Sequence, residues 1–183
     1  MEPLPSVEDG NATPIDPQEE QAPNPLLLRG NTMGGAFAFP ADDDGVTFND
    51  PRIQRAEIAG ANGISTARAL ARLYAGCVSE IDGPRNLTRA SINDALSVQS
   101  EGRSRFGPVE ATSRWGTRFQ IRSPHTQPML SGRSFGHAGA GGQLAFGDDH
   151  FAVGFACLSN QMGAPGDARA RELTAAVQAC LGG

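Results

Sequence analysis

Residues 143–158 read QLAFGDDHFAVGFACL, and this stretch carries the clearest indication of the fold. Two short runs, 143–147 and 150–158, flank the turn-forming pair Asp148-Asp149, so the pattern predicts a β-hairpin. In the second run the large side chains share one face: Phe151, Val153, Phe155 and Cys157. The small residues occupy the other face: Ala152, Gly154 and Ala156. Because small residues on a strand permit a close approach, we expect a helix against that second face.

Upstream of the hairpin, residues 114–122 (RWGTRFQIR) alternate with a period of two. The alternation puts one set of side chains on a single face: Trp115, Thr117, Phe119 and Ile121. The opposite face would carry Arg118, Gln120 and Arg122. We therefore expect one half-buried strand over 114–122, which gives about three antiparallel strands in all.

Helical spacing marks segments before and after these strands. Residues 66–78 carry apolar side chains at that spacing, and Ser65 or Thr66 can cap their start. A shorter helix, expected after Thr88, covers Ile92, Ala95 and Leu96. Asp167 is expected to cap a last helix whose apolar stripe comprises Ala170, Leu173, Ala176, Val177, Cys180 and Leu181. Together these elements predict an α+β fold, with an antiparallel sheet packed against helices.

The N-terminal region differs in composition from the rest. Residues 1–30 hold six prolines and six carboxylates, and proline fixes φ and removes a hydrogen-bond donor. We expect an irregular segment over 1–30 and a single domain over 31–183. The first part of that domain, 31–58, has apolar side chains without a sustained helical period. It is expected to form an ordered wrapping loop.

The balance of charges excludes several classes of function. The chain has 20 acidic and 15 basic residues, a net charge of −5, which argues against a nucleic-acid partner. All 15 basic residues are arginine, so every chemistry that needs lysine is excluded within these 183 residues. No apolar run is long enough to span a bilayer, and residues 1–30 show no signal peptide. We therefore expect no membrane association and a cytoplasmic location.

The segment FGHAGAGG, residues 135–142, is the strongest candidate for a functional site in the sequence. Glycine permits a ligand to approach the backbone closely, or an unusual φ. The segment does not fit a dinucleotide-binding loop, because Gly139-x-Gly141 would need a glycine where Leu144 stands. A tight entry to a strand, with crowded packing, is the alternative interpretation.

Several segments of the chain resemble one family of enzymes. Glu57-Ile58, Ala61–Ile64 and Thr66–Ala75 are similar to a stretch typical of serine β-lactamase-like proteins: class C β-lactamases, penicillin-binding-protein-like peptidases and related esterases. Phe135–Gly142 is similar to the FGHxGxGG segment of this family, and Phe155–Met162 to its FAYVMNRM segment. The resemblance covers about residues 24–181, ending in the last helix, and implies the C-terminal part of that fold.

The resemblance also implies roles for four residues. His137-Ala138-Gly139 aligns with the strand that lines one wall of the family's acyl-enzyme site. His137 would be the polar group near the substrate carboxylate or the leaving group, and Ala138 and Gly139 would contact substrate. The backbone N–H of Ala140 would be one of two oxyanion donors. Many members have a hydroxyl where this chain has Ala138.

The family's nucleophile and base have no counterpart in this chain. The nucleophile is the serine of Ser-x-x-Lys, which needs a lysine, and Tyr74 lies inside the predicted helix rather than in the family's tyrosine motif. We therefore expect a partial hydrolase domain that is inactive alone in the family's reaction, acyl transfer and hydrolysis of esters or amides. Its expected partner is an N-terminal half-domain that supplies serine, lysine and tyrosine.

Two alternatives stay open. The first is a non-catalytic interaction protein that derives from this fold and self-associates. The second is a small esterase that uses Ser134, because Gly132–Gly136 satisfies the Gly-x-Ser-x-Gly pattern of the nucleophile elbow.

No metal or cofactor is expected. The three histidines, His125, His137 and His150, have no further ligands at a suitable spacing. The run Asp42–Asp44 is expected to form a solvated turn. The three cysteines are expected to act as small buried hydrophobic residues: Cys77, Cys157 and Cys180.

Overall fold

The computed structural model describes residues 25–31, 33–35, 48–58, 60–81, 83–103, 112–123, 126–163 and 167–182. The chain forms two compact units, Met1–Arg55 and Ala56–Gly183. Most of the segment expected to be irregular, and the run Asp42–Asp44, lie outside the described residues.

The described part of the first unit is mostly helical. It contains α1 (Pro25–Asn31), the 3-10 helix η2 (Met33–Gly35) and α2 (Pro51–Arg55). The segment 31–58, expected to be a loop, therefore contains two short helical elements. At the start of α2 the side chain of Arg52 donates a hydrogen bond to Asp50, which lowers the pKa of that carboxyl to about 2.

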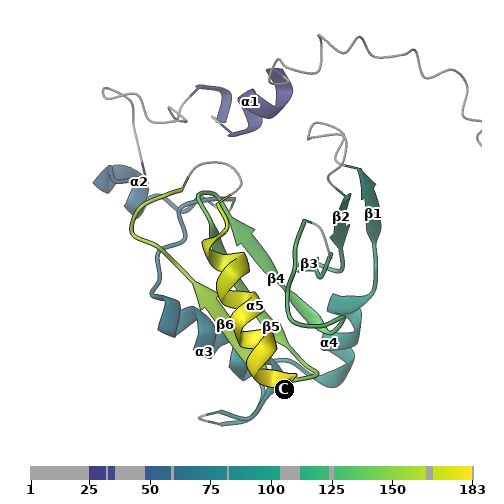
Figure 1. Cartoon of the computed structure of the whole chain (residues 1–183). Coiled ribbons are helices and arrows are strands. Elements are labelled where there is room, and N and C mark those ends of the chain that lie inside the picture. The colour runs from purple at the N-terminus through teal and green to yellow at the C-terminus, as the bar shows by residue number, and fades with distance from the viewer. Residues whose placement is uncertain are drawn as a thin grey trace, which may run out of the picture. The chain divides into compact units, whose positions relative to one another are not determined.

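The second unit contains one antiparallel sheet of six strands, in the order β1-β2-β3-β4-β5-β6. The α+β class is confirmed, but the sheet has twice the expected number of strands. The strands are β1 (Ser100–Arg103), β2 (Thr112–Trp115), β3 (Gln120–Ile121), β4 (Ser134–Gly139), β5 (Gln143–Asp148) and β6 (Val153–Cys157). Figure 1 shows these strands with α3 (Ala67–Val78), α4 (Arg89–Leu96) and α5 (Arg169–Leu181) around them.

The single strand expected over 114–122 is wrong, because the chain reverses direction in the middle of it. β2 and β3 pair through Trp115 and Gln120, and the amide of Gly116 donates to the carbonyl of Phe119 at 2.9 Å. Arg118 in the turn between them has a positive φ of 71°. A tight turn of this kind leaves the period-two alternation of hydrophobicity unbroken, so the alternation alone could not locate it.

The two faces of the sheet bury two separate apolar clusters. Val78, Ile92, Ala95, Ile121 and Phe135 form the cluster under α3 and α4. Met129, Leu130, Leu144, Phe146 and Ala170 form the cluster under α5. The large side chains of the second hairpin arm join this second cluster, as the alternation predicts: Phe151, Val153, Phe155 and Cys157.

The two predicted internal helices are confirmed, as is the cap of the first, and a threonine caps the second as well. Thr66 caps α3 by accepting a hydrogen bond from the amide of Ala69 at 3.1 Å. Thr88 caps α4 by accepting from the amide of Ser91 at 3.1 Å. In both cases a threonine hydroxyl satisfies an amide that the first helical turn leaves without a partner.

The last helix differs from its prediction at its start. Its N-cap is Ala168 rather than Asp167. Asp167 still accepts a hydrogen bond from the amide of Arg169 at 2.9 Å, and the Arg169 side chain lowers the pKa of this carboxyl through a hydrogen bond.

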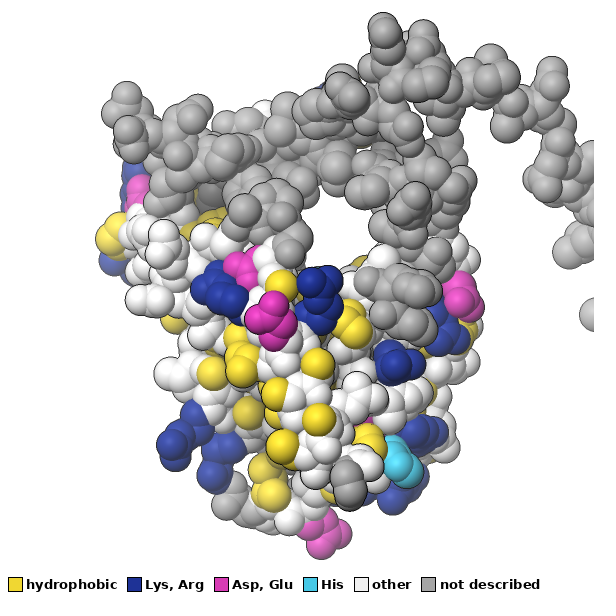
Figure 2. All heavy atoms as spheres, in the orientation of Figure 1, with side chains coloured by type: hydrophobic (Ala, Val, Ile, Leu, Met, Phe, Trp, Pro, Cys, Tyr) yellow, Lys and Arg dark blue, Asp and Glu magenta, His cyan; other side chains and the backbone are white. Residues whose placement is uncertain are grey.

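The buried face of α5 also differs from the predicted stripe. Ala170, Thr174 and Val177 face the sheet, whereas Leu173 and Leu181 are 52% and 38% exposed. Thr174 can be buried because its hydroxyl donates to the carbonyl of Ala170 at 2.8 Å. Cys180 is exposed, so its prediction as a buried residue is wrong, while Cys77 and Cys157 are half-buried. Figure 2 shows hydrophobic side chains gathered along α5 on the surface.

The helix expected against the small residues of the second hairpin arm is α3, which packs across β5 and β6. Gly154 makes this approach possible, because a Cβ atom there would overlap the carbonyl oxygen of Ala71 and the amide nitrogen of Ala75. Both atoms belong to the α3 backbone and cannot move aside as a flexible side chain can. The packing of α3 on the sheet therefore depends on glycine at this position.

We predict that Gly154→Ala destabilises the fold by about 1–3 kcal/mol, because the added methyl group pushes α3 away from the sheet. Urea denaturation of the full chain, followed by circular dichroism, measures the loss. Gly132→Ala is the matched control, since a Cβ atom at Gly132 has no neighbour within 4 Å. Equal effects of the two substitutions would contradict this account of the packing.

Candidate functional site

The end of β4 that bears the predicted wall has strand partners on one side only. β4 pairs with β5 along its whole length, but with β3 only at Phe135 and Gly136. Within the described residues, His137–Gly139 therefore has no strand on the β3 side. The amide of Ala138 on that side donates to Oε1 of Gln120 at 3.0 Å. This stretch is an open strand edge whose first amide is capped by a side chain.

His137 is exposed at this open end of β4. Its ring packs edge-on against the ring of Trp115, with 5.5 Å between the ring centroids. Its Nδ1 lies 2.5 Å from the carbonyl oxygen of Ala138, which can only accept a hydrogen bond. The neutral ring that fits this contact carries its proton on Nδ1. Nε2 then keeps a lone pair that can accept a proton or a hydrogen bond.

The other predicted wall residues lie next to His137. Ala138 is half-buried against the cluster under α5, while Gly139 and Ala140 are exposed. Ala140 begins the turn that joins β4 to β5, so its amide stands at the tip of this open end. His137, Ala138, Gly139 and Ala140 therefore form one strip of β4 and its turn, in which Ala138 is half-buried and the other three are exposed.

Two glycines of the FGHAGAGG segment have a structural explanation. Gly141 and Gly142 have positive φ values of 77° and 87°. A Cβ atom on Gly141 would lie 2.6 Å from Met162, and one on Gly142 would lie 2.7 Å from Asp167. Crowded packing also explains Gly136, which is buried and where a Cβ atom would overlap the carbonyl oxygen of Ala145 on β5. Of the segment, His137–Ala140 is the part that remains available to a ligand.

Ser134 lies at the opposite end of β4 and is fully buried. Its hydroxyl donates to Oδ2 of Asp148 at 2.5 Å and accepts from the amide of Ser131 at 3.0 Å. The strand follows Ser134 directly, whereas a nucleophile elbow needs a helix after the serine. Among the described residues, no histidine ring hydrogen-bonds this hydroxyl. Ser134 therefore has neither the access nor the base that a nucleophile needs.

The side chain of Asp148 is a fully buried acceptor that joins three segments. Its Oδ2 accepts from the hydroxyls of Ser131, at 2.7 Å, and Ser134. Its Oδ1 accepts from the amides of His150, at 3.0 Å, and Phe151, at 2.9 Å. The carboxylate therefore fastens the start of β4 to the turn between β5 and β6. Four donors satisfy it without any cation.

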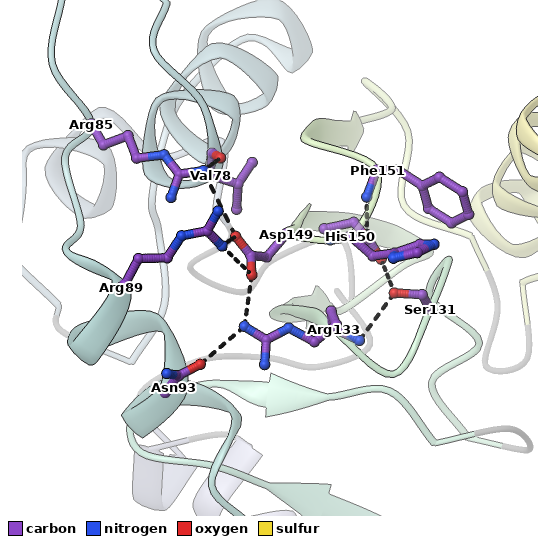
Figure 3. A network of polar contacts seen from close by, with 10 residues as sticks. Val78, Arg85, Arg89, Asn93, Ser131, Arg133, Asp149, His150 and Phe151 are labelled. Carbon is purple, nitrogen blue, oxygen red and sulfur yellow. Dashed lines mark hydrogen bonds and ion pairs between the residues drawn. The ribbon is translucent and has the colours of Figure 1, made fainter.

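Asp149, next in the chain, binds three arginines (Figure 3). Arg89 and Arg133 approach its two oxygens at 2.8 Å and 2.6 Å, and Arg85 lies 3.8 Å away. Arg133 also donates to Oδ1 of Asn93 on α4 at 3.0 Å. These contacts fasten α4 to the same turn. From the sequence, Asp148 and Asp149 indicate only a turn, because partners such as Arg89 lie 60 residues away in the chain.

Two other potentially reactive side chains belong to the core. Tyr74 packs edge-on against Phe135, and burial raises the pKa of its phenol. Burial also raises the pKa of the Cys77 thiol. A raised pKa keeps both groups protonated and unreactive at neutral pH.

The described residues contain no group of three or more His, Cys, Asp and Glu side chains placed to hold a metal ion. Of the three histidines weighed as ligands, His125 lies outside the described residues. No described helix is long and apolar enough to cross a membrane.

Comparison with known proteins identifies relatives over most of the chain. The beta-lactamase family model matches residues 7–179. The esterase/beta-lactamase LipL of Mycobacterium tuberculosis is 33% identical over an alignment of 116 residues, and the alignment covers 60% of this chain and 25% of LipL.

Three solved structures are similar to this one. EstA of Arthrobacter nitroguajacolicus Rue61a aligns with a TM-score of 0.64 and 28% identity, over 73% of this chain and 37% of EstA. A family VIII carboxylesterase aligns with a TM-score of 0.62 and 26% identity, over 72% of this chain and 36% of the esterase. A penicillin-binding protein homologue of Caulobacter crescentus aligns with a TM-score of 0.54 and 32% identity, over 63% and 32%. The chain spans about a quarter to a third of the length of these relatives.

We predict that Asp148→Ala destabilises the fold by about 3 kcal/mol, because it leaves buried donors without an acceptor. Asp148→Asn keeps one carbonyl oxygen and should lose less. Thermal denaturation of the full chain measures both. Asp94→Ala, which removes an exposed carboxylate on α4, is the control and should change stability by no more than about 0.5 kcal/mol. A similar loss in Asp94→Ala would contradict the role of Asp148.

Proposed function

Since this chain belongs to the beta-lactamase family, we propose that it supplies the strand wall of a site that hydrolyses esters or amides by acyl transfer. The serine nucleophile and its lysine come from the part of the family's fold that lies outside these 183 residues. The observation that carries this proposal is the open end of β4, where His137 and Ala140 lie exposed beside an edge without a strand partner among the described residues.

The relatives support the choice of substrate class. Their names include an esterase/beta-lactamase and a carboxylesterase, which act on acyl compounds. The substrate of this chain would be an ester or an amide that lies along the open edge of β4. An extended substrate can pair with a free strand edge through backbone hydrogen bonds.

Each residue of the wall has a place in acyl transfer. The lysine that accompanies the serine takes the proton of its hydroxyl as the oxygen adds to the substrate carbonyl, and the carbonyl oxygen takes the negative charge. The amide of Ala140 donates to that oxygen, together with the amide of the nucleophile. His137 is the polar group beside the substrate carboxylate or the leaving group, and the leaving group takes up the proton that the base holds as the tetrahedral intermediate collapses. Water then releases the acyl group.

Neither Tyr74 nor Ser134 is placed to start this reaction within the part of the chain that the structure describes. A serine hydroxyl is a weak nucleophile until a base takes its proton, and these 183 residues contain no lysine. Tyr74 is packed in the core, and Ser134 is fully buried. The burial of both side chains favours a chain that supplies one side of an active site over an esterase that uses Ser134 as its nucleophile.

We predict that the purified chain does not hydrolyse p-nitrophenyl acetate or a chromogenic β-lactam above background. Co-expressed with the part of EstA outside the aligned region, it should hydrolyse at least one of them. His137→Ala should lower kcat/KM of the mixture by about 100-fold. His150→Ala removes an exposed imidazole away from the wall and serves as the matched control.

Two outcomes would contradict the proposal. The first is turnover by the chain alone that disappears in Ser134→Ala, which would favour an esterase that uses this serine. The second is a mixture whose activity does not respond to His137→Ala.

A further inference from the structure

Three arginines surround the side chain of Asp149 and give this part of the second unit an excess of positive charge. Arg85, Arg89 and Arg133 all place a guanidinium nitrogen within ion-pair distance of its oxygens. Among the described residues, no other carboxylate forms an ion pair with these three side chains. Three cations around one anion leave two positive charges without a counterion, although the whole chain has a net charge of −5.

The excess charge faces solvent, whereas the carboxylate does not. The side chain of Asp149 is 3% exposed, while those of Arg89 and Arg133 are 68% and 41% exposed. Figure 3 shows Arg85 and Arg89 on one side of the carboxylate and Arg133 below it. A ligand that approaches from solvent therefore meets guanidinium groups rather than the carboxylate.

Arg89 and Arg133 have N–H groups that the network does not use. An arginine side chain has five N–H donors. Arg89 contacts both oxygens of Asp149 through Nη1, and Arg133 contacts Asp149 and Asn93 through Nη2. Within the part of the chain that the structure describes, Nε and the other Nη of both arginines have no hydrogen-bond partner. Each guanidinium group is thus held in place and can still donate to a ligand.

Anchoring α4 does not account for the whole cluster. Arg89 alone contacts both oxygens of Asp149, at 2.8 Å and 3.0 Å, and one cation neutralises one carboxylate. Arg89 is also the first residue of α4, where the helix dipole favours anions and opposes cations. Two further guanidinium groups at the same place repel it and each other. A bound anion would remove this repulsion.

We propose that Arg85, Arg89 and Arg133 form a binding site for the phosphate group of a small molecule or a lipid headgroup. A phosphate monoester carries up to two negative charges near pH 7, which is the charge that the cluster lacks. Its oxygens accept charge-assisted hydrogen bonds from guanidinium groups. A nucleic acid fits less well, because the three arginines gather at one point and the rest of the chain is acidic.

This site is separate from the predicted wall. Arg133 directly precedes β4 at its buried end, whereas His137 lies four residues further along the strand. At about 3.3 Å per residue, the two positions are about 13 Å apart. A phosphate bound by the arginines would stabilise the contact between α4 and the start of β4 and would leave the wall uncovered. The inference therefore does not rest on the proposed function.

The test uses the full chain, with inorganic phosphate as the first probe. We expect saturable binding in isothermal titration calorimetry and a Tm that rises with phosphate concentration, because a ligand of the folded state stabilises it. Sodium chloride at the same ionic strength is the control for screening and should raise the Tm less. Glycerol 3-phosphate and phosphatidylcholine vesicles with or without phosphatidic acid then distinguish the two sources of the phosphate group.

Two matched substitutions locate the site. Arg89→Gln removes the most exposed charge of the cluster and should weaken phosphate binding by about 10-fold. Arg68→Gln makes the same change at an exposed position of α3 and should leave binding unchanged. Circular dichroism checks that both variants remain folded.

Asp149→Asn separates a binding site from a purely structural network. The substitution removes the anion of the cluster, so phosphate should bind about 10-fold more tightly. It should also lower the Tm in chloride, and phosphate should raise the Tm of this variant more than that of the unchanged chain. A purely structural network predicts the loss of stability without this recovery, and the comparison of Tm values remains possible even for a destabilised variant.

Binding of glycerol 3-phosphate supports the proposal with a soluble ligand, and binding that depends on phosphatidic acid supports it with a headgroup. Three results would overturn it: no saturable binding of any phosphate probe, equal effects of Arg89→Gln and Arg68→Gln, or no gain of affinity in Asp149→Asn. Hydrolysis plays no part in these measurements, so a failure here leaves the proposed function intact, and inactive mixtures leave the phosphate site intact.

Discussion

The buried carboxylate of Asp148 is the contact on which the arrangement of the second unit depends. It accepts four hydrogen bonds and so fixes the start of β4 against the turn between β5 and β6. Asp149 beside it binds three arginines and fastens α4 to the same turn. Moving a charged group from water into the protein interior is unfavourable. Buried carboxylates therefore persist only where hydrogen-bond donors or cations satisfy their oxygens. The two aspartates therefore set the register of β4 from its buried end.

This anchoring explains why one strand carries two different environments. At its first residue, Ser134, β4 is fully buried and hydrogen-bonded. Toward His137 it becomes exposed, because β3 is only two residues long and stops pairing at Gly136. A site wall needs this combination of rigidity and access, since a reacting group must be held in place while a substrate reaches it. The features that stabilise the fold and those that offer chemistry thus lie at opposite ends of β4.

Local signals predicted much of the fold. α3, α4 and the β5–β6 hairpin follow from helical spacing, threonine caps and a turn-forming pair, which all act within a few residues. β1 was missed because Ser100–Arg103 has no apolar residue to reveal a strand. The hairpin of β2 and β3 was read as one strand because alternation continues through a tight turn. The strip His137–Ala140 stays a predicted site wall, while the network of Asp148 and Asp149 has no signal within its own segment.

The sequence by itself determined the family motifs, the absence of lysine and the grouping of His137, Ala138, Gly139 and Ala140, because these are fixed by residue type and order. Only the tertiary structure decided which serine is buried, which carboxylates carry the anchoring contacts and which flank of α5 faces outward. Those outcomes depend on residues far apart in the chain, such as Arg89 and Asp149, 60 positions away from each other. A pattern within one segment reports the local period of that segment, whereas burial depends on what the rest of the chain places against it.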